Sequence, residues 1–257
     1  MEMTPYEPGT PSWVDLGSPD PVASAAFYSA LFGWDAMDGG PEAGGYRMCS
    51  LGGKPVAGIG AQQQTGMRPY WTTYVSVADA AATTEKVRKA GGKVFMEPME
   101  VIGFGHMAVF ADPTGAAISV WQPLRHIGAG LVNEPGTLCW NELTTREPDL
   151  AVPFYRDVFG WGARPRQMGP VTYTEWTLGE KAVASMMPMD GNWPADLPSH
   201  WMVYFAVADT DAAAARVAEL GGTVHVPPSD IPPGRFAVVT DPHEAAFSLI
   251  TMNPQDG

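Results

Sequence analysis

Two short segments of the chain each place a tryptophan two residues before a carboxylate. The first, WVDL, holds Trp13 and Asp15, and the second, WNEL, holds Trp140 and Glu142. Because side chains alternate along a β-strand, residues two apart face the same way, so each acid shares a surface with its tryptophan. A carboxylate among aromatic rings is partly desolvated, which raises its pKa toward the range useful for general acid–base catalysis.

These two segments belong to a long internal repeat. Trp140 follows Trp13 by 127 residues, and the same offset joins four further pairs of identical residues: Phe27/Phe154, Tyr28/Tyr155, Gly33/Gly160 and Trp34/Trp161. After a three-residue insertion, TYVSVADAAATTEKVRKAGGKV in the first half matches VYFAVADTDAAAARVAELGGTV in the second. Matching on this scale predicts two homologous domains, residues 8–123 and 136–253, joined by a linker of residues 124–135.

Each domain divides further into two units with the same order of elements. A unit opens with a strand, continues with a helix and ends with three short strands. The opening strands are predicted near Trp13, Thr72, Trp140 and Met202. Helix-start signals stand at Asp20-Pro21, Asp79 and Asp209, and helix-ending glycines at Gly33, Gly91, Gly160 and Gly221. This pattern predicts an α+β fold with helices packed outside curved sheets.

The repeated unit resembles the vicinal oxygen chelate superfamily, which includes glyoxalase I, extradiol dioxygenases and bleomycin-resistance proteins. The resemblance is carried by DPVASAAFYSALFGW after the first strand, by VADAAATTEKVRKAGG and by FADPTGAAISVWQP. More narrowly, the chain is similar to tandem-domain glyoxalase-like proteins of the actinobacterial type. The resemblance implies two tandem glyoxalase-like domains, each made of two βαβββ units that form a curved sheet around a cavity.

In that superfamily a divalent metal is held by His or Gln on the opening strands and by Glu on the closing strands. The corresponding positions of this chain are Trp13, Thr72, Trp140 and Met202 on opening strands, and Ser119 and Ser248 on last strands. Indole and thioether groups do not hold Mg, Mn, Zn or Fe(II), and a lone hydroxyl is a poor ligand. We therefore expect no metal and no cofactor in either domain.

Two histidines could still contribute to a cavity. His200 precedes a predicted strand and could reach the second cavity, where Glu142 could join it. His106 occupies a strand position that Arg235 fills in the other half, which favours a polar site at the rim. A metal site with relocated ligands is therefore kept as an alternative.

The remaining candidates for chemistry are the two acids with the tyrosines predicted to face them, Tyr74 and Tyr204. In one interpretation the acid moves a proton next to a carbonyl group while the tyrosine stabilises the enolate. In the other, the acid only accepts hydrogen bonds and fixes the cavity wall. We expect a small-molecule substrate to contact Trp13, Trp140, Thr72, Met202, Ser119, Ser248, His106 and His200.

Three functions follow as alternatives. The first is a metal-independent protein that binds a small apolar or aromatic carbonyl metabolite and catalyses an isomerase- or lyase-type proton transfer. The second is a drug- or metabolite-sequestering protein without catalysis. The third is a metal-dependent lyase or dioxygenase with relocated ligands.

Composition and net charge exclude some classes of binding partner. A net charge of −13, with 15 Lys and Arg among 257 residues, argues against nucleic acid and anionic membranes as partners. The N-terminus shows no export or membrane-anchoring signal, and Cys49 and Cys139 lie far apart without metal-type spacing, so we expect a cytoplasmic protein. Because duplication already supplies a paired domain, we expect a monomer or a homodimer.

Overall fold

The computed structural model describes residues 1–62, 68–168 and 171–253. The first half contains β1 (Pro11–Ser18), α1 (Pro21–Phe32), β2 (Asp35–Asp38), β3 (Arg47–Leu51), β4 (Lys54–Ala61), β5 (Tyr70–Ser76), α2 (Ala80–Lys89), β6 (Lys93–Val101), β7 (Gly105–Ala111) and β8 (Ala117–Pro123). The second half contains β9 (Leu138–Thr145), α3 (Pro148–Phe159), β10 (Gly162–Met168), β11 (Val171–Leu178), β12 (Lys181–Pro188), β13 (His200–Ala206), α4 (Thr210–Glu219), β14 (Thr223–Ile231), β15 (Gly234–Thr240) and β16 (Ala246–Met252).

Each half forms one eight-stranded mixed sheet. The strand order is β2-β3-β4-β1-β5-β8-β7-β6 in the first sheet and β10-β11-β12-β9-β13-β16-β15-β14 in the second. The opening strands of the two units, β1 with β5 and β9 with β13, pair antiparallel at the centre of their sheet. Each opening strand also pairs in parallel with the last strand of its own unit. The predicted α+β fold, with two βαβββ units per domain, is confirmed.

The helix boundaries follow local sequence signals. The side chain of Asp20 accepts hydrogen bonds from the backbone N–H groups of Val22 and Ala23 at the start of α1, and Asp79 and Asp209 cap α2 and α4 in the same way. The helices α1 and α3 end at the predicted Gly33 and Gly160, both in the left-handed conformation. The helices α2 and α4 end at Lys89 and Glu219, slightly before the predicted glycines.

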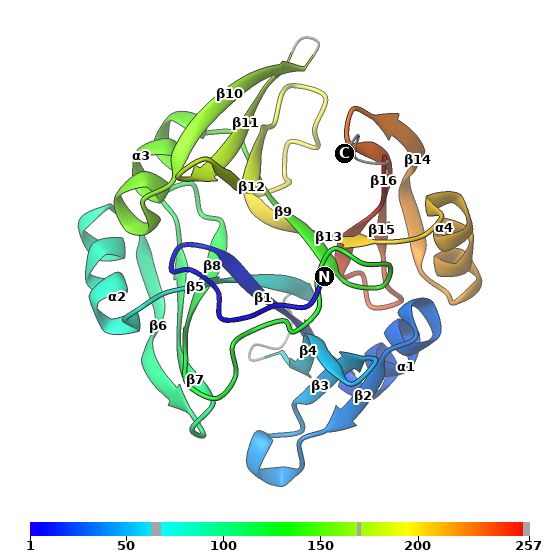
Figure 1. The fold of residues 1–257 in the computed structure, drawn as a ribbon. Helices are drawn as coiled ribbons and strands as arrows, with labels where there is room; N and C mark the ends of the chain where they lie inside the picture. Colours follow the sequence, from blue (N-terminus) through cyan, green and yellow to red (C-terminus); the bar gives the residue numbers. More distant parts are fainter. Residues whose placement is uncertain (63–67, 169–170, 254–257) are drawn as a thin grey trace.

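The two sheets pack back to back through the faces that carry their helices. Phe27 and Phe32 of α1 share a buried core with Phe205 and Phe247 of the second sheet. The other core joins Phe154 of α3 to residues of α2, β7 and β8. Figure 1 accordingly shows α2 beside α3 on one side of the molecule and α1 near α4 on the other. The hydrophobic core is therefore shared between the domains, and the opposite face of each sheet points away from it.

Two buried tyrosine hydroxyls cross this domain boundary in equivalent positions. Tyr155 donates to Oδ2 of Asp112 at 2.8 Å and accepts from Nε1 of Trp201 at 2.9 Å. Tyr28 makes the matching bonds with Asp241 and Trp71, both at 3.2 Å. Each hydroxyl thus satisfies a polar group of the other domain and one of its own.

No helix among the described residues is long and apolar enough to span a membrane.

Replacing Tyr155 by Phe tests this boundary. The change removes the hydroxyl that accepts from the buried Trp201 indole N–H, so we expect the free energy of unfolding to fall by about 2 kcal/mol in urea titrations. Tyr70→Phe is the matched control because the Tyr70 side chain is 43% exposed, and its effect should stay within about 0.5 kcal/mol. Equal stability of the two variants would contradict the role of the buried hydroxyl.

Candidate functional site

The chemistry-bearing residues lie on the face of each sheet that carries no helix, here called the helix-free face. Val14 and Leu16 of β1 are fully buried in the core beneath the helices. Trp13 and Asp15 alternate with them and therefore point to the opposite face. In the second domain Leu143 belongs to the core beneath the helices, so Glu142 lies on the helix-free face.

Strand register brings the predicted residues of the first domain together. Asp15 lies opposite Thr72, Trp13 opposite Tyr74, and Tyr74 next to Ser119 in the parallel pair. The Tyr74 hydroxyl donates to Oδ2 of Asp15 at 2.9 Å. The predicted pairing of acid and tyrosine is thus present in the structure.

A second tyrosine joins this group. The Tyr46 hydroxyl accepts from Nε1 of Trp13 at 3.1 Å and lies 3.5 Å from Oδ2 of Asp15. It occupies space directly above Gly58, because a Cβ atom at that position would lie 1.7 Å from the hydroxyl oxygen. Only glycine at position 58 leaves room for this bridge between the indole and the carboxylate.

The second domain builds the same group with different side chains. Glu142 lies opposite Met202, Trp140 opposite Tyr204, and Tyr204 next to Ser248. The Tyr204 hydroxyl donates to Oε1 of Glu142 at 2.9 Å.

Here a serine replaces the tyrosine as the bridge. The Ser185 hydroxyl accepts from Nε1 of Trp140 at 2.8 Å and donates to Oε2 of Glu142 at 3.1 Å. Ser185 lies opposite Glu142, just as Gly58 lies opposite Asp15. Both domains therefore connect indole N–H, hydroxyl and carboxylate in one chain.

Neither bridging residue, Tyr46 or Ser185, was among the predicted site residues. Their signal in the sequence is the 127-residue offset, which relates Tyr46 to Tyr173 and Gly58 to Ser185. Tyr173 also lies close to Glu142. Burial raises the pKa of the Tyr173 phenol, and the negative charge of Glu142 raises it further.

Burial controls the protonation of both groups. It raises the pKa of Asp15 to about 6, although hydrogen bonds from Tyr74, Thr72 and Tyr46 partly offset the effect. Burial likewise raises the pKa of Glu142, with hydrogen bonds from hydroxyl groups acting in the opposite direction. Desolvation holds the pKa of Tyr74 and Tyr204 well above the usual range, so both phenols stay protonated and act as donors.

Comparison with known proteins identifies the fold family. Residues 10–120 and 121–249 each match the model of the Glyoxalase/Bleomycin resistance protein/Dioxygenase superfamily. The chain belongs to this superfamily.

Curated relatives of this superfamily match over nearly the whole chain. The chain is 45% identical to the protein named "Putative glyoxylase CFP32" of Mycobacterium tuberculosis, over 97% of both chains. It is 43% identical to "Anthracycline biosynthesis protein DnrV" of Streptomyces peucetius, over 97% of this chain and 96% of that one. The Mn(II)-bound glyoxalase of Novosphingobium aromaticivorans shares the fold, with a TM-score of 0.65 and 18% identity over 95% of this chain and 82% of the other.

The superfamily's metal does not fit the residues present. The positions that correspond to its ligands carry indole, thioether and hydroxyl groups, and the nearby carboxylates Asp15 and Glu142 already accept hydrogen bonds from hydroxyl groups. Within residues 1–62, 68–168 and 171–253, no three or more His, Cys, Asp or Glu side chains are grouped as a metal site. We therefore derive no chemical step through a metal ion.

The structure places one of the two predicted histidines on a helix-free face and the other on a face that carries helices. His200 lies on the helix-free face opposite Thr144, with Nδ1 2.9 Å from the carbonyl oxygen of Pro198, and burial lowers its pKa. His106 alternates with Met107 and lies opposite Gln122, on the face that carries α2. The structure thus brings His200, but not His106, to the face of the carboxylates.

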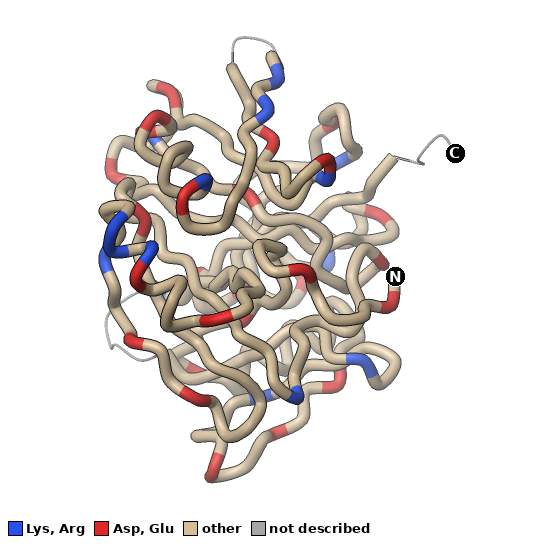
Figure 2. The backbone as a smooth tube through the Cα atoms, turned by 60° about the vertical axis from the view of Figure 1, so that its left-hand side comes forward, with Lys and Arg blue, Asp and Glu red and all other residues tan. Residues whose placement is uncertain are grey.

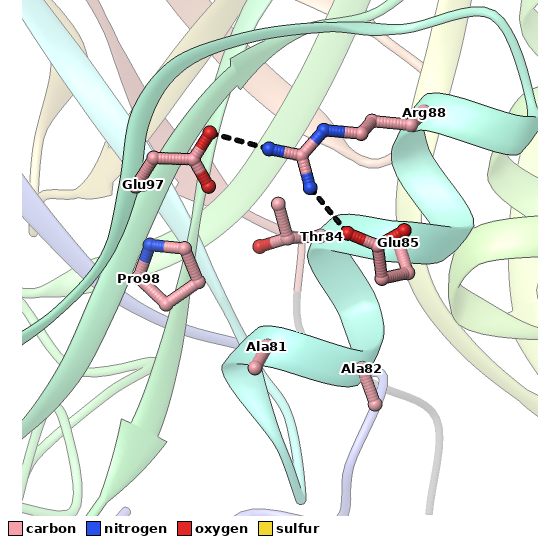
Figure 3. A pocket seen from close by; sticks show the side chains of 7 residues that line it. All are labelled: Ala81, Ala82, Thr84, Glu85, Arg88, Glu97 and Pro98. Carbon is pink, nitrogen blue, oxygen red and sulfur yellow. Dashed lines mark hydrogen bonds and ion pairs between the residues drawn. The ribbon is translucent and has the colours of Figure 1, made fainter.

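A shallow hollow of about 290 Å³ lies elsewhere, between α2 and β6. Figure 3 shows Arg88 in it, paired with both Glu85 and Glu97. These exposed ion pairs already satisfy the charged groups, so the hollow adds nothing to the site on the helix-free faces.

The raised pKa of Asp15 predicts a pH-dependent cost to stability. The unfolded chain releases this proton near pH 3.8 and the folded chain near pH 6, so stability falls as pH rises between these values. Asp15→Asn removes the penalty, and its stability relative to the unmodified chain should rise by up to about 3 kcal/mol between pH 4 and 7 in urea titrations. A pH-independent difference between the two proteins would contradict a buried, protonatable Asp15.

The bridge in the second domain is tested by Ser185→Ala. Losing a donor to the charged carboxylate should raise the pKa of Glu142 further, as measured by ¹³C NMR of labelled glutamate. The free energy of unfolding should fall by about 1 kcal/mol because the Trp140 N–H loses its acceptor. Ser185→Thr retains the hydroxyl and should leave both quantities near their original values; equal shifts in the two variants would exclude the bridge.

Proposed function

We propose that this protein is a metal-independent member of its superfamily that binds a small apolar or aromatic carbonyl compound and transfers a proton with a carboxylate of the helix-free face. The observation that carries the proposal is a desolvated acid, Asp15 or Glu142, with raised pKa and a protonated phenol 2.9 Å away. The reaction class is isomerisation or elimination next to a carbonyl group.

The proton transfer uses only groups of this chain. The ionised carboxylate removes a proton from the carbon beside the carbonyl, and the electron pair of the broken C–H bond moves toward the carbonyl oxygen. The phenol of Tyr74 or Tyr204 donates a hydrogen bond to that developing oxyanion. The carboxylic acid then returns the proton to another carbon or protonates a leaving group, which restores the carboxylate. A pKa near 6, as at Asp15, suits both halves of this cycle.

Ligand chemistry is constrained by charge. In the described part of the chain, neither carboxylate has a Lys, Arg or His among its hydrogen-bond partners. Figure 2 shows acidic residues spread over much of the backbone and fewer basic ones, in keeping with the net charge of −13. This field disfavours anionic ligands. The name of DnrV, an anthracycline biosynthesis protein, supports a polycyclic aromatic ketone as the ligand class.

Sequestration without catalysis is the second candidate. It is favoured by the hydrogen bonds that already satisfy each carboxylate, as expected for an acid that only shapes a binding surface. Catalysis predicts that replacing the acid removes turnover, whereas sequestration predicts that the ligand stays bound as before.

The deciding experiment follows hydrogen–deuterium exchange into a panel of aromatic ketones in D₂O by mass spectrometry. We expect exchange with the unmodified protein and a loss of at least 100-fold in the double variant Asp15→Asn/Glu142→Gln, since general acid–base catalysis contributes about 10²–10⁴-fold. Ligand affinity should change much less. Asp35→Asn and Glu180→Gln are controls, because both acids are exposed.

Each other outcome overturns the proposal. Binding without exchange in the unmodified protein would establish sequestration. Exchange that survives in the double variant would exclude the two carboxylates. Stoichiometric metal in the purified protein, with activity lost on its removal, would establish the metal-dependent alternative with relocated ligands.

A further inference from the structure

The linker between the domains covers the tryptophan of the first helix-free face. Ala129 and Val132 of the linker are buried, and they pack in one cluster with Trp13, Tyr74 and Trp121. Only 4% of the Trp13 side chain remains exposed. The side of this indole that faces away from the sheet is therefore occupied by the chain itself.

Backbone hydrogen bonds fix the linker in this place. The N–H of Ala129 donates to the carbonyl oxygen of Ser12 at 2.7 Å, and the N–H of Gly130 donates to that of Pro55 at 2.7 Å. Gly128 has φ of +107°, and a Cβ atom there would lie 2.3 Å from the Ser12 oxygen, so the close approach depends on this glycine.

The N-terminal segment adds a second layer of contacts. The Tyr6 hydroxyl donates to the carbonyl oxygen of Ala129 at 2.8 Å, and the N–H of Met3 donates to that of Gly130 at 3.0 Å. Figure 1 shows the N-terminal segment running beside β1. The linker is thus held from both sides.

The contact with Trp13 includes an aromatic ring. The His126 ring stands perpendicular to the Trp13 ring with 4.6 Å between centroids, and the carbonyl oxygen of His126 accepts from Nε1 of Trp121 at 2.7 Å. Burial lowers the pKa of His126 to about 4, so the ring is neutral at physiological pH. A flat, uncharged ring with aliphatic neighbours therefore fits against this tryptophan.

The second helix-free face has the opposite pattern of exposure. Trp140 is partly exposed, whereas Glu142 and Tyr204 beside it are each only 8% exposed. In the first domain Asp15 is partly exposed and the tryptophan is covered. The two domains thus share one arrangement of polar groups but leave different ends of it accessible.

The other end of the second face is bordered by the segment 189–199. Arg146, which follows β9, donates to the carbonyl oxygens of Asp190 and Pro194 in this segment. The Thr145 and Ser199 hydroxyls are 2.9 Å apart. These contacts lie beyond the Glu142 end of β9, on the side away from Trp140, which is partly exposed.

We infer that the protein binds one flat aromatic ligand per chain, on Trp140 of the second domain, and that the linker takes the equivalent place on Trp13 of the first domain. The ligand ring lies against the indole, and its polar edge reaches Glu142 and Tyr204. The aromatic ligand class rests on the proposed function; the assignment to one domain rests on the contacts of the linker.

The test uses 1,8-dihydroxyanthraquinone as the probe. Isothermal titration should give one site per chain. Amide hydrogen exchange should show protection by the probe in β9, β12 and β13 and none in β1, β4 and β5. Trp140→Leu should weaken binding at least tenfold, whereas Phe95→Leu, at a surface ring 55% exposed on the first domain, should not change it.

A linker variant provides the converse test. Replacing His126, Ala129 and Val132 together by glycine or serine should loosen the linker and raise the number of sites from one to two. Should this variant fail to fold, amide hydrogen exchange on the unmodified protein still shows which domain binds the probe. Two sites in the unmodified protein, protection confined to the first domain, or no binding of the probe would each overturn the inference. One-site binding of this probe on Trp140, together with no deuterium incorporation into any aromatic ketone that carries a C–H beside its carbonyl group, would instead overturn only the proposed proton transfer.

Discussion

The back-to-back packing of the two sheets is the constraint on which the other features depend. The hydroxyls of Tyr28 and Tyr155 are buried between the domains, and each satisfies a carboxylate of one domain and an indole of the other. Moving the domains apart would break these hydrogen bonds between domains and expose the apolar residues of the shared core to water. The helix-bearing faces of the two sheets are therefore buried against each other. The faces that point outward are therefore the ones on which we propose ligand chemistry.

Alternation along the central strands then determines the chemistry of the outward faces. The same strands that send Val14 and Leu143 into the shared core send Asp15 and Glu142 to the other side. The shorter aspartate is bridged to its indole by Tyr46 above Gly58, and the longer glutamate by Ser185. Asp with Gly and Glu with Ser are thus two solutions to one hydrogen-bond geometry. A serine at position 58 would collide with Tyr46, because a Cβ atom there would lie 1.7 Å from the Tyr46 hydroxyl oxygen.

Much of this arrangement could be predicted from the sequence, because it depends on short-range periodicity and on a repeat. The pairing of Asp15 with Tyr74 is one example. Once the repeated unit is recognised, β1 and β5 are expected to be antiparallel neighbours, and alternation along each strand places both side chains on the same face. The position of Tyr46 could not be predicted in this way, because it depends on the space left above Gly58 on a different strand. His106 was assigned to the rim from its match with Arg235, but strand register turns both toward the helices.

The position of the linker also could not be predicted from local sequence, and it gives equivalent polar groups of the two domains different exposure to solvent. Its contacts join residues far apart in the chain, and no local pattern in residues 124–135 predicts which face they cover. Once both ends of the linker are fixed by folded domains, its residues are present beside Trp13 at an effective concentration in the millimolar range. A free metabolite at micromolar concentration must bind Trp13 much more tightly than the linker does in order to displace it. On Trp140 the proposed ligand meets no tethered competitor from the linker, because the linker residues Ala129 and Val132 pack against Trp13. Divergence of the two domains in ligand binding then requires no change in the carboxylate, the phenol or the indole.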